Sequence, residues 1–216
     1  MALLPVADRF RCTSADYRSA QVHSAELDLA LGFRCESVEA RLQRAVYRLD
    51  QQPWIGLALQ ALQTPYSELL EILERVSPLP GSLWVDVGAG YGRMALVLAA
   101  RFPEVGFLGF ELVAERVEEA RRVWAQFELP RARIETADMA SPEFRWPEAD
   151  GYFLYDFGSR EDIQHSLEEL RRIARNRPIT VVARGRGVRH EIDSRHPWLG
   201  QVNPAEHFSH YSIYRS

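Results

Sequence analysis

The sequence predicts an α/β protein with a doubly wound sheet, and two patterns carry this prediction. Short apolar segments alternate with amphipathic ones from residue 81 onward, and a glycine-rich turn follows the first apolar segment. Strands that are separated by helices pair in parallel, and a parallel sheet needs helices on both of its faces. The 216 residues are enough for one domain with a smaller extension and a buried core.

The part of the chain before Pro78 is predicted to be helical. Apolar residues recur at helical spacing in Ser37–Leu49 and again in Tyr66–Val76. For residues 1–30 the sequence is compatible with either a helix or a loop. The run Pro-Leu-Pro-Gly at residues 78–81 separates this region from the alternating strands and helices.

Each of the first strands leads into a helix, except the third, which is followed by a polar connection. Apolar and β-branched residues favour the strands, and one-sided apolar spacing favours the helices. The predicted strands are Leu83–Val87, Gly106–Phe110, Arg133–Ala137, Gly151–Tyr155 and Ile179–Ala183, followed by the candidates Leu199–Val202 and His207–Tyr214 on either side of a turn at Asn203-Pro204. The predicted helices are Arg93–Phe102, Ala114–Phe127 and Glu161–Arg175.

The basic residues are all arginines. The chain has 26 of them against 30 acidic residues, for a net charge of −4, and it has no lysine. This composition excludes a Schiff-base lysine and a P-loop lysine. It also argues against a dedicated nucleic-acid binder, which usually has a basic excess. Arginine instead suits the binding of carboxylates or phosphates, because its guanidinium is a planar fork.

The cysteine content and the hydropathy predict a cytoplasmic protein. Cys12 and Cys35 are too few for a disulfide scaffold, which fits a reducing compartment. No stretch of about 20 apolar residues could span a bilayer, so no contact with a membrane is expected.

The glycine-rich turn is the most informative segment. Residues 85–92 read Val-Asp-Val-Gly-Ala-Gly-Tyr-Gly, at the point where the first strand ends and a helix begins. A dinucleotide-binding turn would need a further glycine at the position of Arg93, and the carboxylate of Asp86 would repel a pyrophosphate. A ligand with a positive centre, such as a cofactor that contains an amino acid and a sulfonium, fits these residues better.

Acidic residues also follow the next two predicted strands. Glu111 ends the second strand and Asp138 comes after the third. Together with Asp86-x-Gly88-x-Gly90-x-Gly92, this pattern resembles class I S-adenosylmethionine (SAM)-dependent methyltransferases over about residues 66–186. The resemblance implies a seven-stranded, mostly parallel sheet in the order 3-2-1-4-5-7-6. It further implies that Glu111 binds the ribose hydroxyls and that Asp138 meets the adenine amino group, although caps or turns could also explain such acids.

The resemblance divides the chain and names a cofactor site. Residues 1–80 would form an N-terminal helical cap, and residues 81–216 would form the SAM-binding domain. The residues expected to bind the cofactor are Asp86, Val87, Gly88, Ala89, Gly90, Gly92, Glu111, Leu112, Asp138 and Met139, together with Thr64 and Tyr66 from the segment that precedes the first strand.

The acceptor of the methyl group is expected beside the end of the fourth strand. Tyr155 and Asp156 lie there, and Asp156 is the best candidate to orient or deprotonate an amine or hydroxyl. A loop acid without a catalytic role is the alternative. His190, after the fifth strand, is a further candidate base. His190 and His196 could bind a metal together with Asp156, but two histidines in a polar loop are more often ordinary surface residues, so no metal site is expected.

Arginines gather after the fifth strand, and three of them suggest a partner. Arg184, Arg186 and Arg189 could hold an anionic substrate or RNA, or they could belong to a solvated loop. The predicted function is methyl transfer from SAM to a nitrogen or oxygen of an unidentified acceptor. The alternatives are a non-catalytic SAM-binding module and an NAD-dependent oxidoreductase. The segment Gln52-Pro53-Trp54-Ile55 could form a lid or simply pack.

Overall fold

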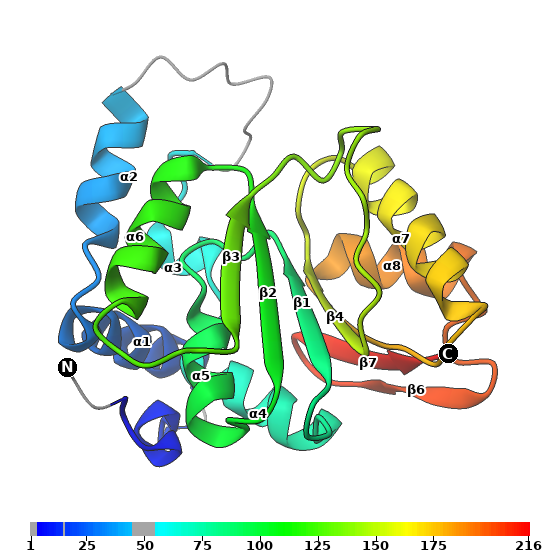
Figure 1. Cartoon of the computed structure of the whole chain (residues 1–216), viewed down its shortest axis with the longest axis horizontal. Coiled ribbons are helices and arrows are strands. Elements are labelled where there is room, and N and C mark those ends of the chain that lie inside the picture. The colour runs from blue at the N-terminus through cyan, green and yellow to red at the C-terminus, as the bar shows by residue number, and fades with distance from the viewer. Residues whose placement is uncertain (1–3, 15, 45–54) are drawn as a thin grey trace.

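The computed structural model describes residues 4–14, 16–44 and 55–216, which form a helical region and a single sheet (Figure 1). The sheet has seven strands in the order β3-β2-β1-β4-β5-β7-β6, so the predicted fold class and strand order are confirmed. The strands are β1 (Leu83–Val87), β2 (Gly106–Glu111), β3 (Ala132–Thr136), β4 (Gly151–Tyr155), β5 (Thr180–Arg184), β6 (Asn203–His207) and β7 (Tyr211–Arg215).

The five strands β1 to β5 run parallel, β7 runs antiparallel to its neighbour β5, and β6 runs antiparallel to β7, in the same direction as β1 to β5. Val87 pairs with Phe110 of β2 on one side and with Leu154 of β4 on the other. Because these strands are parallel and in register, their carboxyl ends lie at one edge of the sheet, where an open α/β fold places its ligand.

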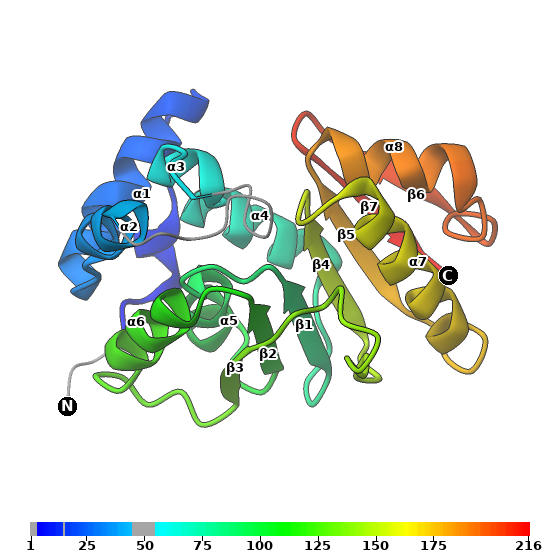
Figure 2. The same ribbon diagram turned by 90° about the horizontal axis from the view of Figure 1, so that it is seen from above.

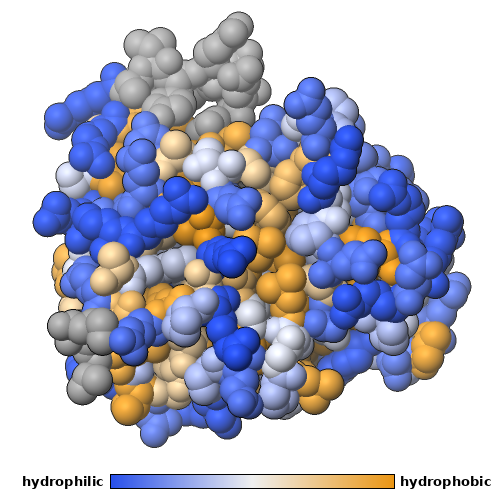
Figure 3. Space-filling model, in the orientation of Figure 1, coloured by the Kyte–Doolittle hydropathy of each residue, from blue (hydrophilic) through white to orange (hydrophobic). Residues whose placement is uncertain are grey.

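The helices are η1, a 3-10 helix (Ala7–Phe10), α1 (Tyr17–Leu31), α2 (Cys35–Arg44), α3 (Leu59–Leu62), α4 (Tyr66–Val76), α5 (Arg93–Arg101), α6 (Ala114–Trp124), α7 (Arg160–Ala174) and α8 (Arg186–Arg195). Figure 2 shows the sheet between α4, α5 and α6 on one face and α7 and α8 on the other. The surface over these helices is mostly hydrophilic, with apolar side chains visible near the middle of the face in Figure 3.

Two apolar clusters fill the two faces. Neighbouring strand residues alternate between them, since successive side chains of a strand point to opposite sides. Trp84 and Phe153 belong to the first cluster, and Val85 and Leu154 belong to the second. The first cluster also holds buried residues of α1, α2, α4, α5 and α6, whereas the second holds residues of α7 and α8. The N-terminal helices therefore share one core with the sheet, and a boundary at residue 80 stays a prediction.

The predicted elements up to β5 are present, with ends that differ by at most a few residues. α4, β1 and β4 have the predicted bounds. α2 ends at Arg44 among the described residues, so the last part of the predicted helix 37–49 lies outside them, as do residues 52–54 of the suggested lid.

Two predictions near the C-terminus are wrong. Residues 186–195, expected to be a polar loop, form α8, and the strand expected at 199–202 is found at Asn203–His207 instead. The turn predicted at Asn203-Pro204 is thus the start of β6. This strand is the edge of the sheet, where the missing N–H of a proline is tolerated. Among the described helices, none is long and apolar enough to cross a membrane.

Candidate functional site

A cavity of about 540 Å³ opens at the carboxyl edge of the sheet. Its walls come from the glycine-rich turn after β1, the ends of β2 and β4, the segment after β3, and the chain before α4. The residues that line it are Ile55, Leu57, Ala61, Leu62, Gln63, Gly88, Gly90, Tyr91, Glu111, Leu112, Val113, Arg116, Asp138, Met139, Ala140, Tyr155, Asp156, Phe157, Gly158 and Asp162. The cavity therefore lies where the sequence predicted the cofactor.

The glycine-rich turn is held against β2 by backbone hydrogen bonds. The N–H groups of Gly88 and Ala89 both donate to the carbonyl of Phe110, at 2.9 and 2.8 Å. Gly88 has a φ of +80°, a conformation that favours glycine, and it lines the cavity together with Gly90. The turn thus brings bare backbone to the cavity wall, as close contact with a ligand requires.

Glu111 is tied to this turn and faces the cavity. Its Oε2 accepts the N–H of Gly90 at 2.8 Å, and its Oε1 accepts the N–H of Val113 at 2.9 Å. The residue is buried, with 6% of its surface exposed. An ionised carboxylate offers about four acceptor positions. The two backbone amides occupy two of them, so Glu111 can still accept hydrogen bonds from two hydroxyl groups in the cavity.

Asp86 lies behind the turn, beside a smaller cavity of about 30 Å³ that also borders Gly88 and Gly90. Burial, and secondly the charge of Glu111, raise the pKa of Asp86 to about 8. Ala89 and Thr64 line the same small cavity. These three residues therefore lie next to the larger cavity rather than in its wall.

The segment after β3 supplies another part of the wall. Oδ1 of Asp138 accepts the N–H of Ala140 at 3.0 Å, which closes a local turn. Asp138, its neighbour Met139, and Leu112 after β2 all line the cavity. The prediction that they surround one ligand is consistent with this placement.

Three of the predicted cofactor residues do not line either cavity. Val87 is fully buried in β1. A Cβ at Gly92 would lie 2.3 Å from Cζ2 of Trp124, so this glycine makes room for a core side chain. Tyr66 is fully buried, and its hydroxyl donates to Oδ1 of Asp28 at 2.9 Å. The prediction of Tyr66 as a cofactor contact is wrong, because α4 turns this side chain into the core.

Tyr155 and Asp156 do line the cavity, and both have partners in the protein. The hydroxyl of Tyr155 donates to the carbonyl of Ala61 at 3.2 Å. The Tyr155 ring lies 4.2 Å from the guanidinium carbon of Arg184. Asp156 accepts the backbone N–H groups at the start of α8, which makes it a cap for that helix. The end of β4 is therefore a rigid part of the wall.

The predicted arginine patch does not form as expected. Arg184 is buried, and its Nε pairs with Oε1 of Glu68 at 2.7 Å, so it is not available to a substrate. Arg186 is exposed on α8, and Arg189 donates to the carbonyl of Ser209 at 3.2 Å. His190 is exposed on the same helix and lines neither cavity. Because α8 replaces the expected loop, these side chains are carried away from the cavity.

The sequence did not identify Leu57, Arg116 and Asp162 as residues of the wall. Arg116 on α6 supplies the one cation of the described lining. Ala61, Leu62 and Gln63 also line the cavity and belong to the segment before Thr64 that the resemblance placed near the cofactor. Phe157 lines it next to Asp156, in the segment expected beside the acceptor. Among the described residues, no group of three His, Cys, Asp or Glu side chains could hold a metal ion.

Comparisons with known proteins agree with this geometry. Residues 85–177 match a family model described as a methyltransferase domain. A structure of precorrin-6y C5,15-methyltransferase from Geobacter metallireducens superimposes with a TM-score of 0.52 at 14% identity, over 74% of this chain and 90% of that one. Residues 85–177 therefore match a methyltransferase domain, and the sheet has the fold of that solved structure. The family resemblance predicted from the motif and the cofactor class, SAM, are thereby confirmed.

Two further relatives show what this methyltransferase domain is similar to. An RNA methyltransferase from Salinibacter ruber, solved with S-adenosyl-L-homocysteine, gives a TM-score of 0.50 at 19% identity, over 71% of this chain and 91% of that one. The trans-aconitate 2-methyltransferase of Methylobacterium nodulans is 32% identical over 106 residues, which make up 49% of this chain. The aligned part spans only 38% of that curated relative. The matches favour the methyltransferase class over the NAD-dependent alternative.

Proposed function

We propose that this chain binds SAM in the 540 Å³ cavity and transfers its methyl group to a nitrogen or oxygen of an acceptor. One observation carries the proposal. The buried carboxylate of Glu111 lines the cavity and is fixed by two backbone amides, which leave acceptor capacity for two further hydrogen bonds. A carboxylate with this spare capacity matches the vicinal hydroxyls of a ribose.

The residues around Glu111 fit the remaining parts of SAM. Asp138 and Met139 would contact the adenine, one through a polar atom and one through an apolar surface. Gly88 and Gly90 would contact the amino-acid part, because their backbone is exposed without a side chain. Asp86 would supply a negative charge once it ionises on binding, on the side where the sulfonium and ammonium would lie.

The chemistry divides between the cofactor and the chain. Bound SAM supplies an electrophilic methyl group on a positively charged sulfur. The chain has to align the acceptor with that methyl group and to exclude water. Tyr155 and Phe157 form an apolar wall at the end of β4, and Leu62 faces the same cavity. Asp156 would orient the acceptor N–H or O–H through lone pairs that the amides of α8 leave free.

The size of the acceptor decides whether the arginines of α8 take part. Arg186 is exposed and does not line the cavity, although its neighbour Gly187 donates to Asp156, which does. An RNA acceptor that extends out of the cavity along α8 would reach Arg186 and Arg189. A small anion inside the cavity would not reach them. Methylation of RNA therefore predicts a role for these two side chains, and methylation of a small molecule does not.

We also place the reaction in the cytoplasm. Cys12 and Cys35 are both free thiols, as a reducing compartment would leave them. The Cys35 side chain is buried, so its thiol has little access to oxidants. Fractionation of the native source cells, followed by immunodetection of the chain, tests this placement.

Calorimetry with SAM tests the binding step. Glu111→Ala should raise the Kd for SAM by about 100-fold or more, because the two hydroxyl contacts and the tether to Gly90 are lost together. Glu135→Ala on the neighbouring strand is the control, since Glu135 is exposed and outside the cavity. Equal affinities in the wild type and both variants would contradict the proposed site.

Transfer is tested separately from binding. The purified chain is incubated with SAM carrying a labelled methyl group and with protein, RNA and small-molecule fractions of a lysate. Label in any one fraction, absent with Glu111→Ala, identifies the acceptor class. Binding of SAM without transfer to any fraction would favour the non-catalytic module.

A further inference from the structure

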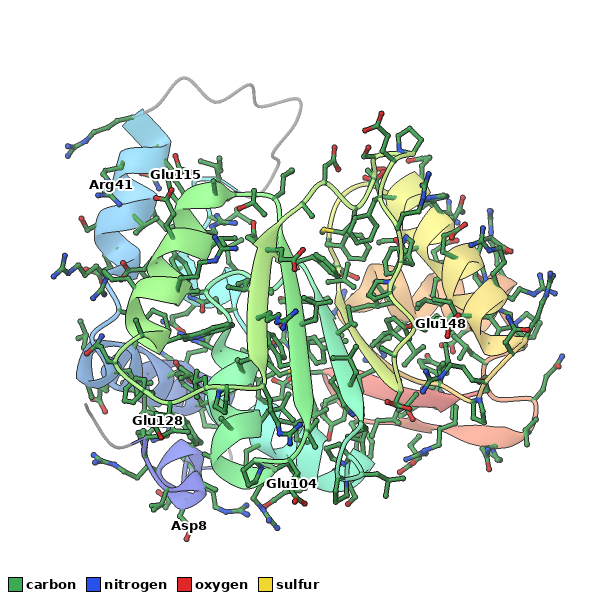
Figure 4. The ribbon with its side chains drawn as sticks, viewed as in Figure 1. Asp8, Arg41, Glu104, Glu115, Glu128 and Glu148 are labelled. Carbon is green, nitrogen blue, oxygen red and sulfur yellow. The ribbon has the colours of Figure 1, made fainter. Side chains whose placement is uncertain are left out.

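A buried acid of the N-terminal region reaches the proposed ribose site through one arginine. Glu39 on α2 is only 5% exposed. Its Oε1 accepts Nε of Arg116 at 2.8 Å, and its Oε2 accepts Nη2 of the same guanidinium at 3.2 Å. α2 lies along α6, and Figure 4 shows Arg41 and Glu115 at neighbouring ends of these two helices. Burial of an unpaired carboxylate costs free energy of folding, and the two hydrogen bonds from Arg116 offset that cost for Glu39.

The other side of the same guanidinium faces Glu111. Nη1 of Arg116 lies 3.6 Å from Oε1 of Glu111, and both side chains line the cavity. This distance is short enough for attraction between charges but too long for a hydrogen bond. Arg116 therefore steadies Glu111 without occupying the acceptor positions that the ribose hydroxyls would use. Hydrogen bonds from Arg116 to Glu39 hold the guanidinium in that place.

Glu39 also holds the glycine-rich turn. The hydroxyl of Tyr91, which lies between Gly90 and Gly92, donates to Oε1 of Glu39 at 2.8 Å. Tyr91 is itself buried against Phe33, with the two rings edge to face at 6.3 Å. One carboxylate thus contacts both the residue that neutralises Glu111 and the turn to which Glu111 is tied.

We infer that Glu39 is a positioning residue for the ribose of the cofactor and that it acts through Arg116 and Tyr91. The inference rests on the proposed SAM site. Glu39 lies outside residues 85–177, which the family model matches, so this device belongs to the N-terminal extension rather than to the common domain. The extension then completes the cofactor site in addition to covering the sheet.

A second buried acid provides a matched control. Glu119, one turn further along α6 than Arg116, accepts the N–H of Arg34 and pairs with Arg122 at 2.7 Å. It links α6 to the start of α2 in the same way as Glu39 does. No described contact joins it to Glu111, and it does not line the cavity. Glu119→Gln should therefore affect stability without affecting the ribose site.

The test compares S-adenosylhomocysteine with its 2′-deoxy analogue by calorimetry. Glu39→Gln should raise the Kd for S-adenosylhomocysteine by about 10-fold, the size of one strong hydrogen bond, and by clearly less for the analogue that lacks the hydroxyl. Glu119→Gln should leave both Kd values within about twofold of the wild type, even where it lowers the Tm. A loss from Glu39→Gln that is equal for the two ligands, or equal to the loss from Glu119→Gln, would overturn the inference.

A second variant covers the case in which Glu39→Gln does not fold. Arg116→Lys keeps the positive charge but loses the planar fork that donates to both oxygens of Glu39, so it should show the same selective loss for the ligand that has both hydroxyls. Equal losses for the two ligands would again overturn the inference. A wild-type chain that binds neither ligand would instead contradict the proposed function itself.

Discussion

Oδ1 of Asp156 accepts the backbone N–H of Val188 at 2.8 Å, which ties the end of β4 to the start of α8. Oδ2 accepts the N–H of Gly187 at 3.1 Å. α8 has no capping side chain of its own, because Gly185 precedes it. A Cβ at Gly185 would lie 2.4 Å from Cγ of Asp156. The carboxylate expected to serve the acceptor is thus also the cap of a helix.

Asp156→Asn should reduce both stability and methyl transfer. An asparagine can accept only one of the two amide hydrogens, so we expect a loss of about 1 to 2 kcal/mol in the free energy of unfolding. We expect the rate of transfer at saturating SAM to fall by about 100-fold, since the amide orients an acceptor N–H or O–H poorly. Denaturant unfolding and a labelled-methyl assay measure the two effects.

Ser159→Ala is the control for that variant. Ser159 caps α7 through the N–H of Asp162, and it does not line the cavity. Its removal should cost about 1 kcal/mol and leave the rate nearly unchanged. Similar rates in Asp156→Asn and Ser159→Ala would show that Asp156 is a structural residue only.

The affinity for SAM should depend on pH through Asp86. Burial and Glu111 raise the pKa of this carboxyl to about 8, so it is largely protonated at neutral pH. A nearby sulfonium favours the ionised form, and binding then releases a proton. The Kd should fall as the pH rises from about 5.5 to about 7.5, by at most tenfold per pH unit. Calorimetry in buffers of different ionisation enthalpy counts the protons released.

Asp86→Asn should remove this dependence, because the amide does not ionise in that range. The stability of the unliganded chain should change with pH in the opposite direction to the affinity for SAM. Since the pKa rises from 3.8 in the unfolded chain to about 8, the protonated folded form is favoured, and the contribution of Asp86 to stability falls as pH rises through this interval. A Kd that is equally flat in wild type and variant would contradict the placement of Asp86 beside the sulfonium.

Gly92→Ala should destabilise the fold more than an alanine at a comparable glycine. Gly92 and Gly81 have φ values of +67° and +79°, so both substitutions carry the strain of a left-handed alanine, about 1 kcal/mol. At Gly81 nothing lies within 4 Å of the new Cβ, whereas at Gly92 Trp124 is 2.3 Å away. We expect an additional loss of about 1 to 3 kcal/mol for Gly92→Ala. Equal midpoints of denaturant unfolding for the two variants would show that Trp124 can move aside without a loss in the free energy of unfolding.

Most elements of the sheet could be predicted because their signal is local. Strands such as β1 and β4 are short apolar runs bounded by polar residues. This pattern lies within the segment itself and does not depend on residues elsewhere in the chain. α8 could not be predicted in this way. It is rich in charges and begins beside two glycines, and its cap comes from Asp156, about 30 positions earlier in the chain. The strand β6 was predicted a few residues too early, because Pro204 was interpreted as part of a turn. An edge strand can contain a proline, however.

The site shows the same division between local and distant causes. The place of Glu111 and Asp138 in one cavity wall could be predicted, because parallel strands end at one edge and bring their following residues together. Tyr66 and Arg184 were misplaced because their partners, Asp28 and Glu68, lie 38 and 116 positions away. Nothing in a single sequence pairs residues over such distances. The pairing of Glu39 with Arg116 was missed for the same reason.

One apolar cluster packs α1 and α2 together with α5 and α6 on the first face of the sheet. Local opening of α2 would expose that cluster and release Glu39 from Arg116 in the same event. Occupancy at the cavity would oppose this opening through thermodynamic linkage, so backbone amides of α2 would exchange their hydrogens more slowly when ligand is bound. Binding of the cofactor would thus slow local opening of α2, although no residue of this helix lines the cavity.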